Sequence, residues 1–117
     1  MSLTSFDFQQ ARVKQVLFKS RLRSVLYGVR EPEPALFALA ENPVGQWIET
    51  VARPALGTSP TLREFEQTLQ QMLHLGQELA ARYQRGHIDE ARAGLEGINS
   101  FADRMEAQLS SLEKLGT

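Results

Sequence analysis

Residues 8–25 read FQQARVKQVLFKSRLRSV, and the spacing of the apolar side chains in this stretch decides the fold class. The spaced positions recur every three or four residues and are Phe8, Ala11, Gln15, Phe18, Leu22 and Val25. Such a period places all of them along one side of an α-helix, with Gln15 as the polar member of the row. Gly28 predicts the end of this helix, because glycine readily adopts the left-handed conformation that closes helices.

Two later stretches repeat this spacing, at residues 62–83 and 88–112. Ser59 and Pro60 predict the start of the first one, since serine caps helix N-termini and proline suits the first helical position. Gly86 predicts its end. The sequence therefore predicts three long helices.

Two short helices are expected between the first and second long ones. Residues 33–41 have the composition of a short helix behind two prolines, and residues 43–52 form another, stopped by Pro54 and Gly57. No stretch alternates as a strand does, and a period near 3.5 favours helices packed at shallow angles. We expect one all-α domain over residues 1–117. Its predicted architecture is an antiparallel four-helix-type bundle with three long helices and two short helical segments between the first and second.

Composition excludes several classes of protein. The chain has no cysteine, which removes disulfides and thiolate chemistry. Its net charge of −1 provides no general attraction to nucleic acid or anionic lipid. No apolar run approaches the roughly 20 residues of a membrane span, and no catalytic motif stands out. We expect a cytoplasmic, non-enzymatic protein that binds no nucleic acid and does not insert into membranes.

Three short motifs carry a resemblance to a known family. They are QVLFKSRL at residues 15–22, NPVGQW at 42–47 and QQMLH at 70–74, and their first positions are 27 and 28 residues apart. In this order and at these distances they resemble the motifs of the chemoreceptor zinc-binding domain. That family is a helical bundle of bacterial chemoreceptors and diguanylate cyclases, and it also occurs as a free-standing protein. The similarity extends over residues 8–112.

The resemblance implies a zinc site and, in this chain, its loss. The family holds zinc through three histidines and a cysteine, whose positions here are Gln15, Asn42, Gln70 and His74. The remaining motif residues, expected near the same pocket, are Phe18, Gly45 and Trp47. Amide oxygens are weak ligands for zinc, so we expect no bound metal and no other cofactor. One hypothesis is that the four polar side chains form a hydrogen-bonded cluster in the former metal cavity.

Several positions admit two interpretations. Gln15 either faces this polar site or lies half-buried at a bundle end and reaches water, because an unpartnered carboxamide costs about 1–3 kcal/mol. Trp47 is either a core residue, which we favour, or an interface anchor. The basic row of Arg12, Lys19 and Arg23 is either a phosphate- or nucleic-acid-binding stripe or, as we favour, a face that is solvated or complements acidic residues of the last helix.

The resemblance also implies a role in bacterial signal transduction and chemotaxis. We expect a regulatory module without zinc, with a protein partner in a signalling pathway. We also expect a homodimer, and the residues beside the main rows that would widen its helix faces are Val13, Leu17, Leu26, Leu73 and Ala80. Two alternatives remain: a structural or adaptor protein with an unused pocket, and a small-ligand or haem binder anchored by His74.

Overall fold

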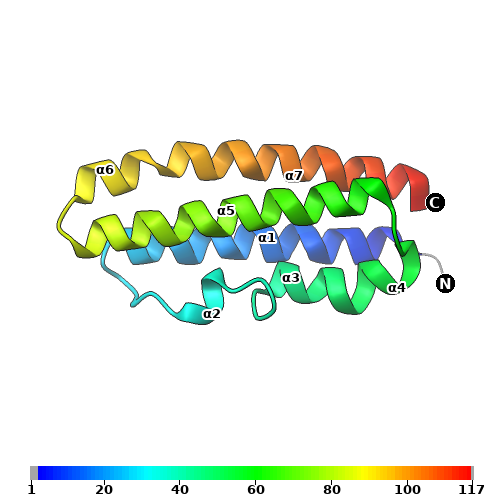
Figure 1. The fold of residues 1–117 in the computed structure, drawn as a ribbon, viewed down its shortest axis with the longest axis horizontal. Helices are drawn as coiled ribbons and strands as arrows, with labels where there is room; N and C mark the ends of the chain where they lie inside the picture. The colour runs from blue at the N-terminus through cyan, green and yellow to red at the C-terminus, as the bar shows by residue number, and fades with distance from the viewer. Residues whose placement is uncertain (1–2, 117) are drawn as a thin grey trace.

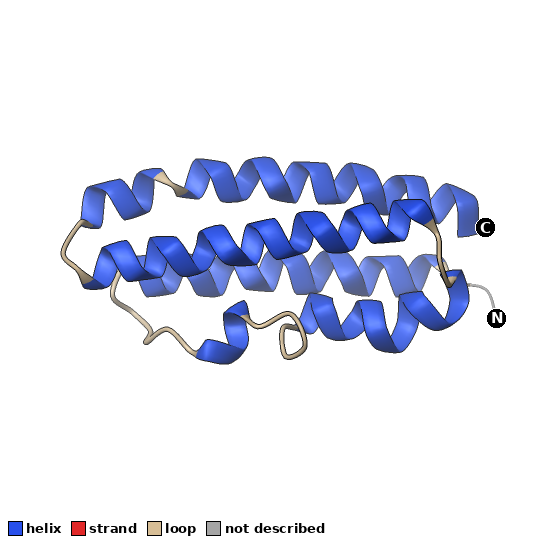
Figure 2. Cartoon of the chain, viewed as in Figure 1, coloured by secondary structure: helices blue, strands red, loops and turns tan. Residues whose placement is uncertain are grey.

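Long helices packed lengthwise make up most of the molecule (Figure 1). The structure, a computed structural model, describes residues 3–116, and these contain helices and loops but no strand (Figure 2). The three long helices are α1 (Ser5–Leu26), α5 (Pro60–Gln84) and α7 (Leu95–Gly116). In Figure 1, α1 and α5 run in the same direction and α7 runs against them. The prediction of an all-α fold with three long helices is confirmed.

The predicted ends of α1 and α5 are confirmed. The Ser59 hydroxyl accepts a hydrogen bond from the Leu62 amide at 3.4 Å, and Pro60 begins α5. Gly28 and Gly86 follow α1 and α5 with φ of 75° and 90°, a conformation that favours glycine. Thr4, which the sequence did not mark, caps α1 in a reciprocal hydrogen-bonded pair with Asp7.

The predicted last helix is interrupted near its start. The structure has α6 (Ile88–Ala93), a break at Gly94, and then α7. A Cβ at position 94 would lie only 2.2 Å from a methyl carbon of Leu79. The glycine therefore lets the α6–α7 junction approach α5 closely, and the apolar spacing alone does not reveal this break.

The segment between α1 and α5 differs most from the prediction. Only α2 (Pro34–Phe37) is helical within residues 33–41. The piece predicted over residues 43–52 does not end at Ala52 but continues through Pro54 to Leu56, directly before Gly57. It is made of α3 (Pro43–Trp47), the π-helix η1 (Ile48–Ala52) and α4 (Arg53–Leu56).

The π-helix explains how the chain passes the proline. In an α-helix, the ring of Pro54 would collide with the carbonyl four residues earlier. Here the Arg53 amide donates to the carbonyl of Ile48, five residues back, in a wider turn. Gly57, with φ of 59°, then ends the segment.

An aromatic cluster fixes α3 between α1 and α5. Trp47 packs edge-on against Phe8 and Phe65, with ring centroids 6.0 and 6.2 Å apart. Its indole nitrogen donates to the Asp7 carbonyl at 3.0 Å. Trp47 is therefore a core residue, as favoured from the sequence.

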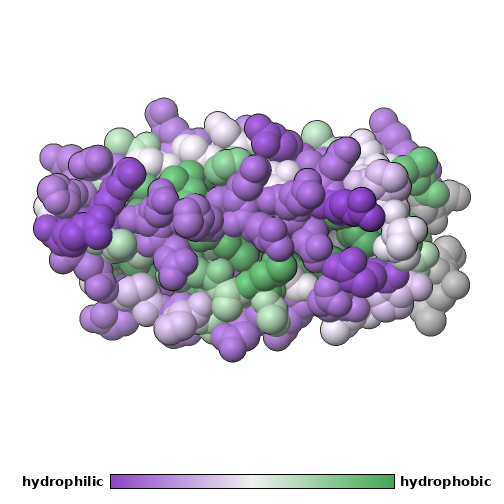
Figure 3. Space-filling view, in the orientation of Figure 1, coloured by the Kyte–Doolittle hydropathy of each residue, from purple (hydrophilic) through white to green (hydrophobic). Residues whose placement is uncertain are grey.

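Figure 3 shows that the face on which α5 lies is covered along its length mainly by hydrophilic side chains. Within residues 3–116, no helix has the length and apolarity needed to cross a membrane.

Candidate functional site

The four positions expected to converge on a metal cavity do not come together. Gln15 and Asn42 are buried, whereas Gln70 and His74 are exposed on α5. None of the four donates a hydrogen bond to another. The hypothesis of a polar cluster filling a former metal cavity is therefore wrong for this structure.

Gln15 is buried in the middle of α1, so the interpretation as a half-exposed residue at a bundle end is wrong as well. Its side-chain nitrogen donates to the carbonyl of Ala102 on α7 at 2.9 Å. Its oxygen is buried without a hydrogen-bond partner. A second carboxamide, on the half-buried Gln108, donates to the hydroxyl of Thr68 at 3.0 Å, and its buried oxygen also has no hydrogen-bond partner. The apolar row of residues 8–25 singled out Gln15, whereas no pattern in the sequence marked Gln108.

Asn42 has a structural role. Its side-chain oxygen accepts from the Val44 amide at 2.9 Å, which caps α3, and its nitrogen donates to the Leu36 carbonyl at 2.8 Å. Both ends of the carboxamide are satisfied, by a backbone carbonyl of α2 and a backbone amide of α3. An Asn-Pro pair before a short helix is a typical N-cap signal, so this role could have been inferred from the sequence.

His74 and Gln70 point away from the core. The His74 side chain is 75% exposed, and its Nε2 lies 3.1 Å from a carboxylate oxygen of Glu78 on the same helix. This environment offers no enclosed apolar pocket of the kind that haem requires. The geometry therefore does not favour His74 as a ligand anchor.

The helical register of α5 explains why Gln70 and His74 lie on the surface and not inside the bundle. Leu69 and Leu73, each one residue before a candidate, are both buried in the core and are also four residues apart. Gly76 packs against Phe18 and Leu22, since a Cβ there would lie 3.2 and 3.4 Å from their side chains. The inward-facing pair of α5 is thus Leu69 and Leu73.

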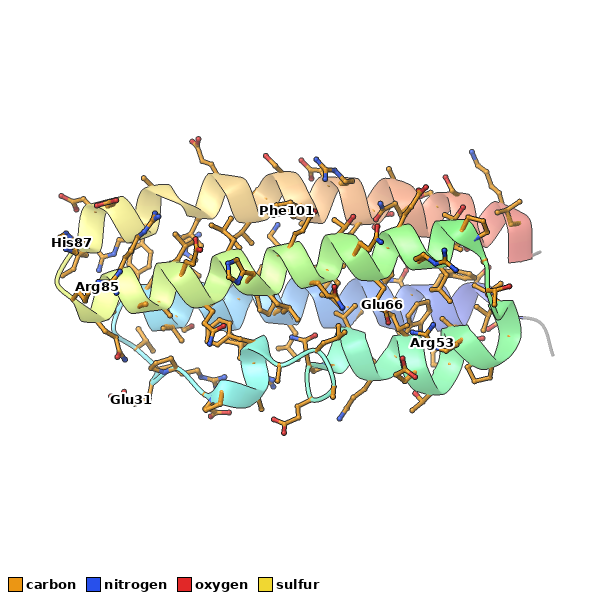
Figure 4. The ribbon with its side chains drawn as sticks, viewed as in Figure 1. Glu31, Arg53, Glu66, Arg85, His87 and Phe101 are labelled. Carbon is orange, nitrogen blue, oxygen red and sulfur yellow. The ribbon has the colours of Figure 1, made fainter. Side chains whose placement is uncertain are left out.

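The donor set does not fit zinc. The inward positions offer Gln15, Asn42 and two leucines, and both amides use polar atoms in structural hydrogen bonds. Among residues 3–116, no three His, Cys, Asp or Glu side chains are grouped so that they could hold a metal ion. Titratable side chains are also dispersed: Figure 4 shows His87 at the α5–α6 turn and the Arg53–Glu66 pair at the opposite end.

The three motif residues expected near a pocket belong to the core instead. Phe18 is 1% exposed, and Trp47 is 2% exposed. Gly45 is buried beneath the loop before α3, where its position next to the Leu39 backbone admits no side chain. These residues account for packing between α1, α3 and α5 rather than for ligand binding.

The outward side of α1 is a better candidate for a functional surface. We define the outer face of α1 by exposed residues that carry no charge, namely Phe6, Gln9, Gln10, Val13, Val16, Leu17 and Ser20. Phe6, Val13 and Val16 are between 58% and 67% exposed. At 3.6 residues per turn these positions share one side of the helix, opposite Gln15 and Phe18. The helix therefore has apolar side chains on two sides, and on the outer side they are mixed with uncharged polar ones.

Basic residues border the outer face on both sides. Lys14 and Arg21 lie along one edge, and Lys19 and Arg23 lie along the other. Within the described chain, none of these four forms an ion pair. The basic row was expected to pair with acidic residues of the last helix, and this is confirmed only for Arg12. Its guanidinium lies 2.8 Å from Glu106 and 3.0 Å from Glu113.

A groove opens beside the outer face, between α1 and α7. It is lined by Val16, Lys19, Ser20 and Arg23 from α1 and by Leu95, Ile98 and Asn99 from α7, and it encloses about 430 Å³. Arg23, which lines the groove, also lies over the ring of Tyr27 together with Arg92, and their guanidinium carbons are 5.4 and 4.1 Å from the ring centroid. The arrangement combines apolar walls with fixed positive charge.

The sequence interpretation noted Val13 and Leu17 but combined them with buried residues. Leu26, Leu73 and Ala80 are at most 5% exposed and belong to the core, so they cannot contribute to an interface. A helical projection of residues 5–26 would have shown the second apolar side.

No protein-family model matches the chain, and comparison with curated proteins and with solved structures gives no match either.

Proposed function

We propose that the chain is a non-catalytic, cytoplasmic docking module of a regulatory pathway, which binds a partner protein through the outer face of α1 and holds no zinc. The observation that carries this proposal is the exposed, uncharged side of α1 between two basic edges. Interfaces typically have an uncharged, apolar centre and a polar or charged rim. An exposed apolar row on a helix otherwise favours aggregation unless a partner covers it.

The resemblance to the chemoreceptor zinc-binding domain agrees with this role. If α3, η1 and α4 are counted as one helical rod, four rods lie lengthwise against one another, and this arrangement supports the antiparallel four-helix-type bundle that the resemblance implies. Family members act within signal transduction and chemotaxis, so a partner in such a pathway is part of the proposal. The amides and leucines at the inward positions support a module that has lost the metal.

A homodimer is the second candidate, because a second copy of the chain could cover the same face. Two outer faces packed together would bring basic edges against basic edges. Lys14, Lys19, Arg21 and Arg23 would then lie among like charges, which opposes association. The charge pattern therefore favours a different protein as the partner.

Site-specific crosslinking in cells tests the docking function. A photo-crosslinking amino acid at Val13, in the outer face, is compared with the same residue at Gln70, which is exposed on α5. We expect one protein, identified by mass spectrometry, to be captured from position 13 alone. Leu17→Asp should abolish this capture without changing the circular dichroism spectrum. Equal capture from both positions, or none from position 13, would refute the proposal.

A further inference from the structure

We propose that the partner presents an acidic amphipathic helix, which lies in the groove between α1 and α7 and rests its apolar side on Val16, Leu95 and Ile98. Its carboxylates would lie beside Lys19 and Arg23. This inference rests on the proposed docking function and specifies the chemistry of the partner.

The walls of the groove have the spacing that packs a helix. On α1 the lining positions are 16, 19, 20 and 23, and on α7 they are 95, 98 and 99. Side chains three and four residues apart form ridges on a helix, and a third helix packs between two such ridges. The floor residue Ile98 is only 1% exposed, whereas Val16 is 65% exposed on the rim. The groove is therefore concave, and it suits a protruding ridge of side chains better than a flat surface.

The charge of the groove selects an acidic partner. The sequence of α1 contains five basic residues and a single acidic one, Asp7, although the whole chain has a net charge of −1. Arg12 is neutralised by Glu106 and Glu113, and Arg53 by Glu49 and Glu66. No carboxylate of residues 3–116 lies within ion-pair distance of Lys19 or Arg23. Complementary charge at an interface accelerates association and excludes wrong partners.

A second copy of the chain offers no matching helix. The exposed large apolar residues outside α1 and its C-terminal turn are Ile88 and Leu115, which lie on different helices. The solvent side of α5 is polar, with Gln67, Gln70, Gln71 and His74 exposed. No surface of the described chain thus combines an apolar ridge with acidic edges.

Binding of a synthetic helix tests the inference. The probe is a peptide of about 20 residues with leucines along one side and glutamates along both edges, which is long enough to form a helix on its own. Its control has the same leucines, with lysines replacing the glutamates. Fluorescence anisotropy should show binding of the acidic peptide and at least tenfold weaker binding of the lysine peptide.

Matched variants connect the binding to the groove. The double variant Lys19→Glu, Arg23→Glu should bind the acidic peptide at least tenfold more weakly. It should bind the lysine peptide more tightly than the unmodified protein does. Arg63→Glu with Arg85→Glu, the same charge change at an exposed residue of α5 and at the exposed residue that follows this helix, should leave both affinities within about twofold. Val16→Asp should also remove binding. All variants are checked by circular dichroism, so that a loss of binding is separated from a loss of fold.

Other outcomes would overturn the inference in distinguishable ways. If the protein binds both peptides equally, or binds neither, the proposal that the partner presents an acidic helix is refuted. The docking function is tested separately, by crosslinking from position 13. Sedimentation with phosphatidylglycerol vesicles but not with phosphatidylcholine vesicles would assign the basic edges to a membrane surface. A dimer mass by light scattering that is lost in Leu17→Asp would assign the face to a second copy.

Discussion

The backbone of Gly45 lies so close to Leu39 that a Cβ at position 45 would be 1.8 Å from the Leu39 carbonyl oxygen. This contact folds the loop between α2 and α3 onto the start of α3. Asn42 secures the same loop through its bonds to Leu36 and Val44. The motif Asn-Pro-Val-Gly-Gln-Trp is therefore a folding element, which positions Trp47 against α1 and α5.

Gly45→Ala should destabilise the protein strongly. The neighbouring atom is backbone, so it cannot move aside as a side chain would, and we expect a loss of roughly 2–4 kcal/mol in the free energy of unfolding. Urea denaturation followed by the fluorescence of Trp47, the single tryptophan, measures this loss. Gly97→Ala is the control, because its Cβ would meet only a methyl carbon of Leu75. A loss below 1 kcal/mol in Gly45→Ala would contradict the close packing.

Gln15→Met should stabilise the protein by about 1 kcal/mol. The buried oxygen of Gln15 has no partner, and methionine fills a similar volume without a polar group. The Ala102 carbonyl, which loses the Gln15 donor, lies inside α7 and keeps its helical hydrogen bond. The midpoint of urea unfolding gives the change. A destabilisation of more than 1 kcal/mol would show that the carboxamide is better satisfied than its environment indicates.

Arg12→Met should cost about 1 kcal/mol, a typical value for a partly exposed ion pair of good geometry. The hydrogen bond to Glu106 is the largest cause that raises the pKa of Arg12, and Glu113 adds to it, so the guanidinium stays charged throughout the stable pH range. Lys19→Met on the same helix removes a basic residue without an ion pair and should cost almost nothing. Unfolding in high salt should reduce the difference between the two variants. Equal costs would contradict the assigned pairs.

The sequence predicted those parts of the fold that depend on local signals. The apolar rows, the Ser59 cap and Gly86 define long helices through contacts three or four residues apart, which can be read from one chain. The break at Gly94 and the passage through Pro54 depend on tertiary contacts, namely the approach to Leu79 and the π-helical turn of η1. These contacts have no signature in the spacing of apolar residues.

The candidate site failed for a related reason. Matching QQMLH to a family motif assumed which side of α5 faces inward, and an error of one residue rotates a side chain by about 100°. The apolar row in 62–83 already contains Leu69, so the register could have been checked against it. Val13 and Leu17 were grouped with the buried rows, because the spacing of the buried row alone does not reveal a second row on the opposite side of α1.

The corrected register leads to a prediction about metal. Gly76 lies opposite Phe18, while Phe65 and Phe8 both contact Trp47. These two pairs mark two levels along the bundle, one at Phe18 and Gly76 and one at Phe8 and Phe65. Because α1 and α5 run in the same direction, the residues between these levels lie opposite each other (Figure 1). Gln15 falls between them on α1, as do Leu69 and Leu73 on α5. Asn42 precedes Trp47 on the antiparallel α3 segment.

A zinc site should therefore form when the inward positions carry metal ligands. The variant Gln15→His, Asn42→Cys, Leu69→His, Leu73→His places three imidazoles and a thiolate at one level of the core, a tetrahedral donor set. It should retain one zinc per chain after gel filtration, and its melting temperature should rise with zinc and fall with chelator, since ligand binding stabilises the folded state.

Two comparisons make this zinc prediction decisive. The unmodified protein should retain well under one zinc per chain and show no thermal shift with zinc. The variant Gln15→His, Asn42→Cys, Gln70→His keeps His74 but has two of its four donors in solvent, so it should bind zinc only weakly. Tight zinc in this second variant and none in the first would restore the original register of α5. If neither variant binds zinc, the inward positions do not converge. The resemblance to the zinc-binding family would then lose its physical support.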